Sequence, residues 1–315
     1  MAGKYMGAGF KGTVDWDNEP YFVKSDAQLL KVMQDTIKAS HLAKHVPTFN
    51  EMALKAVCIN PSVPDNYSKV GNTRFGGLPD LPLGVDYPSK TGPYRKKGFE
   101  HYSFFAQINC AELAPYQAYL PREGILYFFV TDEDEYHSEV WYYPKPDRLV
   151  TGMALQNIDF NNPYRHEPYK PYRAEFRKLI ALPAYFDDMP LYKHEDEAYG
   201  SFKERHALTN MPKIQSFSES LGRKGIFRQH NKVYYTDTNH TINDSVLTIG
   251  GDSPYKMAAD SRGGDPEDWM VLLRLFSHYE SEFQFYDAGE LYFMIHKSDL
   301  AKRHFSNVFS FAESS

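Results

Sequence analysis

The heptapeptide GILYFFV, residues 124–130, returns near the other end of the chain as GELYFMI, residues 289–295. In each copy a glycine precedes a Leu-Tyr-Phe string and two further apolar residues. Glycine reaches turn conformations that other residues reach only at a cost, and a short apolar run rich in aromatic residues is typical of a buried strand. We therefore interpret both copies as strands that follow a turn.

Two more segments repeat in the same order. RFGGLPDLP at residues 74–82 resembles TIGGDSPYK at residues 248–256, and SFFAQIN at residues 103–109 resembles WMVLLRLF at residues 269–276. Recurrence of three elements in one order indicates an internal duplication. The repeats predict two β-rich halves, which either extend one sheet or pack face to face.

The composition agrees with a protein built on sheets. Of the 315 residues, 42% are hydrophobic and 16% are aromatic, with 24 tyrosines and 22 phenylalanines. This content favours strands and allows a sizeable core. We predict an α+β fold that is mainly antiparallel β, with the internal duplication of a β-rich half and a few peripheral helices.

Local signals predict further elements. Ser25 is a suitable N-cap for a helix that we expect to end at Pro47. Asn109 is expected to cap a short helix, with Glu112 completing a capping box. Further elements are predicted as strands in VWYYP at residues 140–144 and FRKLIALP at residues 176–183, and as a helix within residues 192–224.

Charge and cysteine content restrict the classes of function. The chain has 35 basic and 41 acidic residues and a net charge of -6, so we expect no affinity for nucleic acid or anionic lipid, and a basic partner is favoured. Cys58 and Cys110 lie far apart, as expected for buried thiols in a reducing compartment. Because the sequence has neither an apolar run that would span a bilayer nor a signal peptide pattern, we expect a cytoplasmic protein without membrane contact.

Motifs for catalysis or metal binding are weak. His41 and His45 have the spacing with which two imidazoles reach one Zn²⁺, but Leu42 occupies the position of the glutamate in a zinc protease motif. We interpret both histidines as facing solvent near a helix C-terminus. The chain contains neither a G-x-S-x-G motif nor a Walker loop. We therefore expect a protein that is not an enzyme and has no cofactor or metal.

The acidic run at residues 132–135 is the most pronounced charged feature. It separates two predicted strands, and it lacks the alternating spacing and the glycine of a Ca²⁺ loop. One interpretation is a solvated hairpin tip, and the other is a docking surface for a basic cleft. The candidate partner-binding residues are Asp132, Glu133, Asp134, Glu135 and Tyr136, together with Trp16 and Tyr21 near the N-terminus.

Several strings in order resemble the YwqG-like family of bacterial domains: FGGLPDLP, FFAQINCAEL, LPREGILYFFV, DWMVLLRLF, DAGELYFMI and HKSDLAKRHFSNV. The resemblance implies a domain at residues 55–315 after an N-terminal extension, residues 1–54, with one helix. Two halves, at about 55–148 and 225–315, are joined by an irregular or helical connection. The family implies a mixed α+β fold with antiparallel sheets and no established reaction. Members resembling this chain occur in bacterial loci that encode secreted polymorphic toxins.

Two functional hypotheses follow. The first is an immunity protein that binds and occludes a cognate antibacterial toxin, a nuclease or an NAD-using transferase with a basic or phosphate-binding cleft. The alternative is a hydrolase or a small-ligand-binding sensor that uses a groove between the two halves. The candidate groove residues are Arg74, Gly76, Gly77, Gly250, Gly251 and Arg274.

Overall fold

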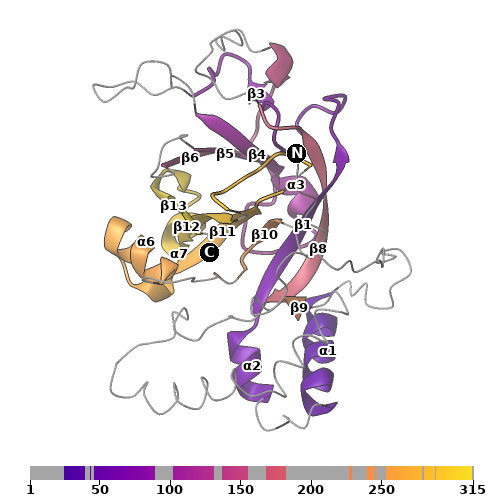
Figure 1. Cartoon of the computed structure of the whole chain (residues 1–315), viewed down its shortest axis with the longest axis vertical. Helices are drawn as coiled ribbons and strands as arrows, with labels where there is room; N and C mark the ends of the chain where they lie inside the picture. The colour runs from indigo at the N-terminus through magenta and orange to yellow at the C-terminus, as the bar shows by residue number, and fades with distance from the viewer. Residues whose placement is uncertain are drawn as a thin grey trace, which may run out of the picture.

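The structure of the chain, a computed structural model, consists of many antiparallel strands and a few short helices (Figure 1). It describes residues 25–39, 43, 46–88, 102–130, 137–154, 168–181, 227–228, 240–244, 246, 253–278, 280–287 and 289–313. The strands up to residue 150 are β1 (Leu54–Pro64), β2 (Arg74–Phe75), β3 (Leu81–Pro82), β4 (Ser103–Asn109), β5 (Ile125–Val130), β6 (Ser138–Tyr143) and β7 (Leu149–Val150). The later strands are β8 (Tyr172–Ala181), β9 (Phe227–Arg228), β10 (His240–Ile242), β11 (Trp269–Phe276), β12 (Glu290–His296) and β13 (Phe309–Glu313).

Eleven of the described strands form one sheet. Its order is β13-β12-β11-β10-β1-β8-β2-β4-β5-β6, and β9 pairs with β8 beside this path. Every pairing along the path is antiparallel. Strands β3 and β7 form a separate pair. The predicted fold class, α+β and mainly antiparallel β, is confirmed.

The order of the strands is symmetric about the centre of the sheet. The repeated strings form β4 and β5 in one half and β11 and β12 in the other, and these pairs occupy matching places in the order. Both pairs carry an irregularity at the same point, between Phe104 and Ala106 and between Val271 and Leu273. The repetition in sequence is thus a repetition of local backbone geometry.

The two central strands join the halves into one sheet. Strand β1 from the first half of the chain pairs with β10 of the second, whereas β8 pairs with β2 of the first. Strands β1 and β8 also pair with each other along most of their length. Strand β8 lies within the segment that the sequence analysis treated as a connection between the halves, so part of this segment is central to the sheet.

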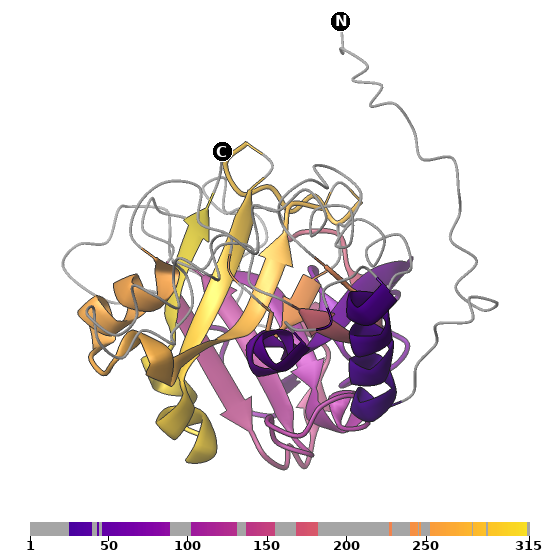
Figure 2. The ribbon, with the colours of Figure 1, turned by 90° about the horizontal axis from the view of Figure 1, so that it is seen from below.

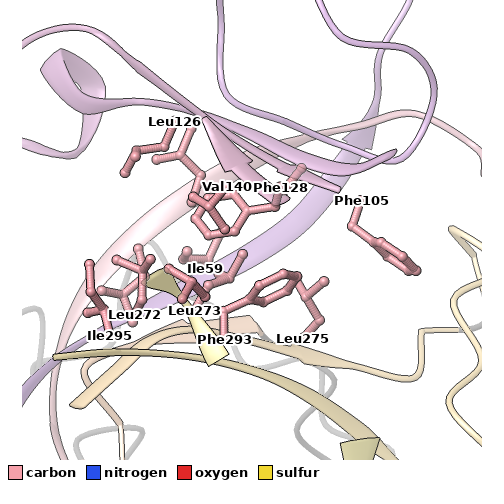
Figure 3. Packing of buried hydrophobic residues seen from close by; sticks show 14 of the residues in the cluster. Ile59, Phe105, Leu126, Phe128, Val140, Leu272, Leu273, Leu275, Phe293 and Ile295 are labelled. Carbon is pink, nitrogen blue, oxygen red and sulfur yellow. The ribbon is translucent and has the colours of Figure 1, made fainter. Parts of the chain in front are cut away.

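Curvature of the sheet brings the two halves face to face. Figure 3 shows Phe128 and Val140 of one half pointing toward Phe293 and Leu273 of the other. The rings of Phe128 and Phe293, the phenylalanines of the two Leu-Tyr-Phe strings, lie edge to face with centroids 5.1 Å apart. The halves therefore both extend one sheet and enclose one core, and burial of these apolar side chains is the main stabilising term.

The helices lie around the sheet. Figure 2 shows α1 on the side of the molecule opposite to α6. Lys178 of β8 donates to Asp26 of α1 at 2.9 Å, which fixes α1 against the sheet. No helix among the described residues is long and apolar enough to cross a membrane. The helices are α1 (Asp26–Ala39), α2 (Val46–Met52), α3 (Cys110–Leu113), α6 (Pro254–Arg262) and α7 (Lys297–Ala301), with 3-10 turns η2 (Gly152–Ala154), η4 (Pro266–Asp268) and η5 (Phe305–Asn307).

Two local predictions are corrected. Ser25 caps α1 as expected, since its Oγ accepts from the backbone N–H of Gln28, but α1 ends at Ala39 and Pro47 lies in the first turn of α2. Proline lacks the N–H that a first helical turn leaves unbonded, so it begins a helix as readily as it ends one.

The predicted capping box of α3 is wrong in one of its two bonds. Asn109 caps α3 by accepting from the N–H of Ala111. Glu112, however, accepts from the N–H of Thr73 at 2.9 Å and pairs with Lys69 at 2.6 Å. The carboxylate thus fixes a distant loop rather than its own helix. His41, His45 and the predicted helix within residues 192–224 lie outside the described residues.

Candidate functional site

Arg74 lies at the centre of a buried polar cluster on the face of β2 opposite to the core. Its Nε donates to Asp65 at 2.7 Å, and its two terminal nitrogens lie 3.1 Å from the two carboxylate oxygens of Asp80. The guanidinium also donates to the Asn72 side chain and the Leu78 carbonyl. All three charged side chains are fully enclosed. Such a set holds the loop after β2 against the sheet.

Burial and the neighbouring positive charge have opposite effects on the pKa of Asp65 in this cluster. Burial alone would raise the pKa of Asp65, but hydrogen bonds from Asn72 and Arg74 and the charge of Arg74 hold that pKa below its ordinary value of 3.8. The neighbouring Tyr127 donates its hydroxyl to the Asp80 carbonyl at 2.6 Å, and burial raises its pKa. The cluster is therefore a carboxylate and guanidinium pair at neutral pH, with a protonated phenol beside it.

Arg274 is the centre of a second cluster on β11. It makes a two-bond fork with Glu290, at 2.7 Å from Nε and 2.5 Å from Nη2, and Nη1 donates to Asp244 at 3.0 Å. The Tyr292 hydroxyl donates to Glu290. Although burial opposes the charged form, the charge of Glu290 raises the pKa of Arg274 above its ordinary value. Paired guanidinium and carboxylate of this geometry are among the stronger polar contacts in proteins.

The two clusters are related by the internal repeat. Tyr127 faces Gln107 across β5 and β4, and Tyr292 faces Arg274 across β12 and β11. Arg74 faces Gln107 from β2, and Thr241 faces Arg274 from β10. In the first half the arginine thus lies on β2, next to the central strands of the sheet. In the second half it lies on β11, one strand further from the centre.

A model of the family of domains of unknown function designated DUF1963 matches residues 73–312. The chain belongs to this family. Comparison with curated proteins finds no match. The DUF1963 region includes both arginines, the acidic run and the described strands after β1, except for the last residue of β13. Helices α1 and α2 and strand β1 precede it, although β1 pairs with strands inside it.

The structure does not bring the two candidate groove arginines of this DUF1963 protein together. Arg74 and Arg274 have no polar partner in common among the described contacts, and β10, β1 and β8 lie between their strands in the sheet. Neither side chain is exposed. Gly250 and Gly251 lie outside the described residues.

Gly76 and Gly77 form a tight turn rather than a ligand cradle. Their φ angles are +69° and +68°, in the region that favours glycine. A Cβ on Gly76 would lie 2.4 Å from the Lys170 carbonyl oxygen, and one on Gly77 would lie 2.2 Å from the Tyr67 hydroxyl. Space next to both glycines is already filled by the protein itself.

Gly76→Ala should therefore lower the free energy of unfolding by about 2 to 4 kcal/mol, from the strained φ together with the collision with a backbone oxygen. Gly84→Ala is the matched control, because Gly84 has a φ of +82° with nothing within 4 Å of the added atom. We expect a smaller loss there, about 1 to 2 kcal/mol, from the strained φ alone. Urea unfolding followed by circular dichroism measures both, and equal losses would contradict the packing argument.

The candidate partner-binding residues lie in segments that are not among the described residues. Trp16, Tyr21 and residues 132–136 lie outside the described residues. Their flanks are defined, since Val130 at the end of β5 pairs with Ser138 at the start of β6. The aromatic residues after the run, Trp141, Tyr142 and Tyr143, are half-buried and pack against the apolar clusters on either face of the sheet.

Sequence reasoning missed the carboxylates of both clusters, which are Asp65, Asp80, Asp244 and Glu290. A signal for them was present. Gln107 and Arg274 each interrupt an otherwise apolar strand, and a buried polar residue requires a partner. These two polar residues indicate which strands carry the clusters, but they do not identify the carboxylates that complete them.

Proposed function

We propose that the protein is a non-catalytic immunity protein that neutralises a cognate antibacterial toxin by binding and occluding it. The observation that carries the proposal is the acidic run in the sequence, residues 132–135, which lies between the segments that form β5 and β6. Strand β6 is the last strand in the order of the sheet, and Glu139 on β6 adds a further carboxylate four residues after the run. Four carboxylates adjacent in sequence suit the basic or phosphate-binding cleft of a nuclease or NAD-using toxin.

The burial of the two arginine clusters supports a binding role for other parts of the surface. Arg74 and Arg274 are fully buried, and each is paired with two carboxylates. A substrate has no access to a guanidinium in this state. The resemblance to YwqG-like members in polymorphic toxin loci agrees with the proposal by association only.

Co-expression tests the proposal directly. The chain is produced together with the product of the gene that lies immediately upstream in its native locus, and growth and co-elution on size exclusion are measured. Restored growth with a stable complex is the expected result. Restored growth without a complex would favour an enzyme that reverses the damage, and absence of rescue by this pair would contradict immunity against that toxin.

Reversing the charge of the acidic run by Asp132→Lys, Glu133→Lys, Asp134→Lys and Glu135→Lys should slow association with the toxin roughly 10- to 100-fold at low salt. The reason is loss of electrostatic attraction to a basic cleft. The matched control converts four scattered exposed carboxylates, Glu51, Asp86, Asp147 and Asp287, to lysine, which changes the net charge equally. Stopped-flow or surface plasmon resonance gives both on-rates. Equal slowing in the two variants would assign the effect to net charge rather than to this surface.

A further inference from the structure

The turn that joins β11 to β12, residues 277–289, packs against the first half of the sheet. Phe283 and Phe285 of this turn are buried. Their ring centroids lie 5.3 Å and 5.6 Å from that of Phe105 on β4, and the Phe283 ring lies 4.9 Å from that of Tyr169. The turn therefore shields part of the aromatic core, provided that it stays closed.

Backbone contacts hold the tip of the turn, residues 278–283. His278 and Phe283 exchange two backbone hydrogen bonds at 2.9 and 3.1 Å, and the Ser281 carbonyl accepts from the N–H of Lys170 at 3.2 Å. The Lys170 ammonium also pairs with Glu282 at 2.6 Å, an exposed contact that contributes little to stability. Glu282 has a φ of +65°, which a residue with a side chain adopts only at a cost. The contacts around the tip must offset this cost to keep it closed.

The His278 imidazole is one of these contacts. The residue is buried, and its Nδ1 accepts from the N–H of Ser281 at 3.1 Å. The Ser281 hydroxyl lies 2.7 Å from the same nitrogen. Because a backbone N–H can only donate, Nδ1 carries no proton in the closed turn, and the imidazole is neutral with its proton on Nε2.

The groups that face the His278 ring come from its own turn and from two strands. In the turn, a carboxylate oxygen of Glu280 lies 3.3 Å from Nε2, on a side chain that is mostly exposed. From β8, the Tyr172 ring meets the imidazole edge to face at a centroid distance of 5.8 Å. From β10, the ring of His240, whose Nδ1 accepts from the N–H of Phe276, lies 6.1 Å away. Glu280 is thus the ionised group that the described contacts place beside the ring.

Protonation of His278 weakens the closed turn in two ways. The added proton occupies Nδ1 and displaces the hydrogen bond from the Ser281 N–H, and the resulting charge lies in a buried site. Burial lowers the pKa of His278 below its ordinary value of 6.5, although the charge of Glu280 acts in the other direction. In an open turn the ring is in water, where it takes up a proton more readily. Acid therefore favours the open form.

We propose that the β11–β12 turn is a pH-sensitive closure of the core, and that protonation of His278 opens it and uncovers Phe283 and Phe285. Because the pKa of His278 is lowered in the closed turn, its contribution to closure is fully present well above pH 6.5. That contribution is lost as pH falls from about 6.5 toward the lowered pKa. This device involves neither the acidic run nor the arginine clusters, so it stands or falls separately from toxin binding.

Hydrogen exchange of the full-length chain, measured by mass spectrometry at pH 7.5, 6.5 and 5.5, tests the proposal. Rates are corrected for the intrinsic dependence of amide exchange on pH, so that they give the opening equilibrium of each segment. For the turn we expect the opening constant to rise about 3- to 10-fold between pH 7.5 and pH 5.5, where about tenfold is the limit for one proton. Residues 291–295 of β12 should show no such rise and are the internal reference.

His278→Asn removes the titrating ring but keeps a side-chain oxygen that can accept from the Ser281 N–H. In this variant we expect the opening constant of the turn to change less than about twofold over the same pH range. His304→Asn is the matched control, because His304 is an exposed histidine outside the turn. It should keep the rise of the parent chain.

Glu280→Gln separates His278 from the neighbouring carboxylate as the titrating group. The substitution removes the charge that favours a protonated ring in the closed turn, so the rise on acidification should be at least as large as in the parent chain. Titration of Glu280 itself would give the opposite result, a smaller rise in the variant. Circular dichroism and thermal unfolding check that each variant folds, and Glu280→Gln, at an exposed position, decides the question where His278→Asn does not fold.

Any of three results would overturn the proposal. The first is an opening constant of the turn that does not rise on acidification of the parent chain. The second is an equal rise in folded His278→Asn, which would assign the acid sensitivity to another group such as His240. The third is a smaller rise in Glu280→Gln than in the parent chain.

Discussion

Arg274→Met should lower the free energy of unfolding by about 3 to 5 kcal/mol, one of the largest losses that we expect from any single change in this protein. The substitution leaves Glu290 and Asp244 facing each other in a buried site with no positive charge between them. Methionine fills much of the space, so the loss comes from the uncompensated carboxylates rather than from a cavity. Urea unfolding at neutral pH measures the effect.

Two further arginine variants make this prediction sharper. Arg274→Lys keeps the charge but replaces the planar fork with a single ammonium group. We therefore expect a loss of unfolding free energy that is smaller than the loss for Arg274→Met. Arg262→Met changes an exposed arginine at the end of α6 and should fall within about 0.5 kcal/mol of the parent chain. A loss for Arg274→Met no larger than that of Arg262→Met would contradict the structural role of the cluster.

Arg74→Met should produce a loss of similar size, about 3 to 5 kcal/mol, and a changed dependence on pH. In the parent chain the pKa of Asp65 lies below its ordinary 3.8, so its contribution to stability is present above that pH and is lost as pH falls through the folded-state pKa. Without Arg74, burial is no longer offset by a nearby positive charge, and the pKa of Asp65 should rise.

The rise in the pKa of Asp65 gives a measurable difference in the pH dependence of stability between the parent chain and Arg74→Met. In Arg74→Met the buried Asp65 carboxylate takes up a proton more readily when folded, so acidification removes its uncompensated charge, and the difference in unfolding free energy from the parent chain narrows between about pH 7 and about pH 4. Denaturation curves across this range follow the difference. A difference that stays constant or widens on acidification would contradict the assignment of the loss to the unpaired charge of Asp65.

The sheet could be predicted from sequence because its strands are strongly apolar and occur twice. GILYFFV and GELYFMI became β5 and β12, SFFAQIN and WMVLLRLF became β4 and β11, and each prediction followed from short apolar runs after turn signals. The phenylalanines of the two copies meet in the core. The pattern of apolar residues, which depends on local sequence, was sufficient to predict these strands.

The polar clusters could not be predicted to the same extent, because their carboxylates lie in loops or on a neighbouring strand, where no local pattern identifies the partner. Asp244 and Arg274 are thirty residues apart, and the Gln107 side-chain oxygen accepts from the backbone N–H of Asp80, 27 residues away. Only the tertiary fold decides which carboxylate reaches which guanidinium. The same reason explains Glu112, which had a suitable partner within its own helix and instead bonds to the Thr73 loop.

The pairing of β1 with β10 and of β8 with β2 means that neither half of this protein is a separable module. The chain up to β8 meets the later strands only along β1 in the order of the sheet. A cut between β9 and β10 would therefore leave each fragment with an exposed strand edge, that of β1 in one fragment and that of β10 in the other.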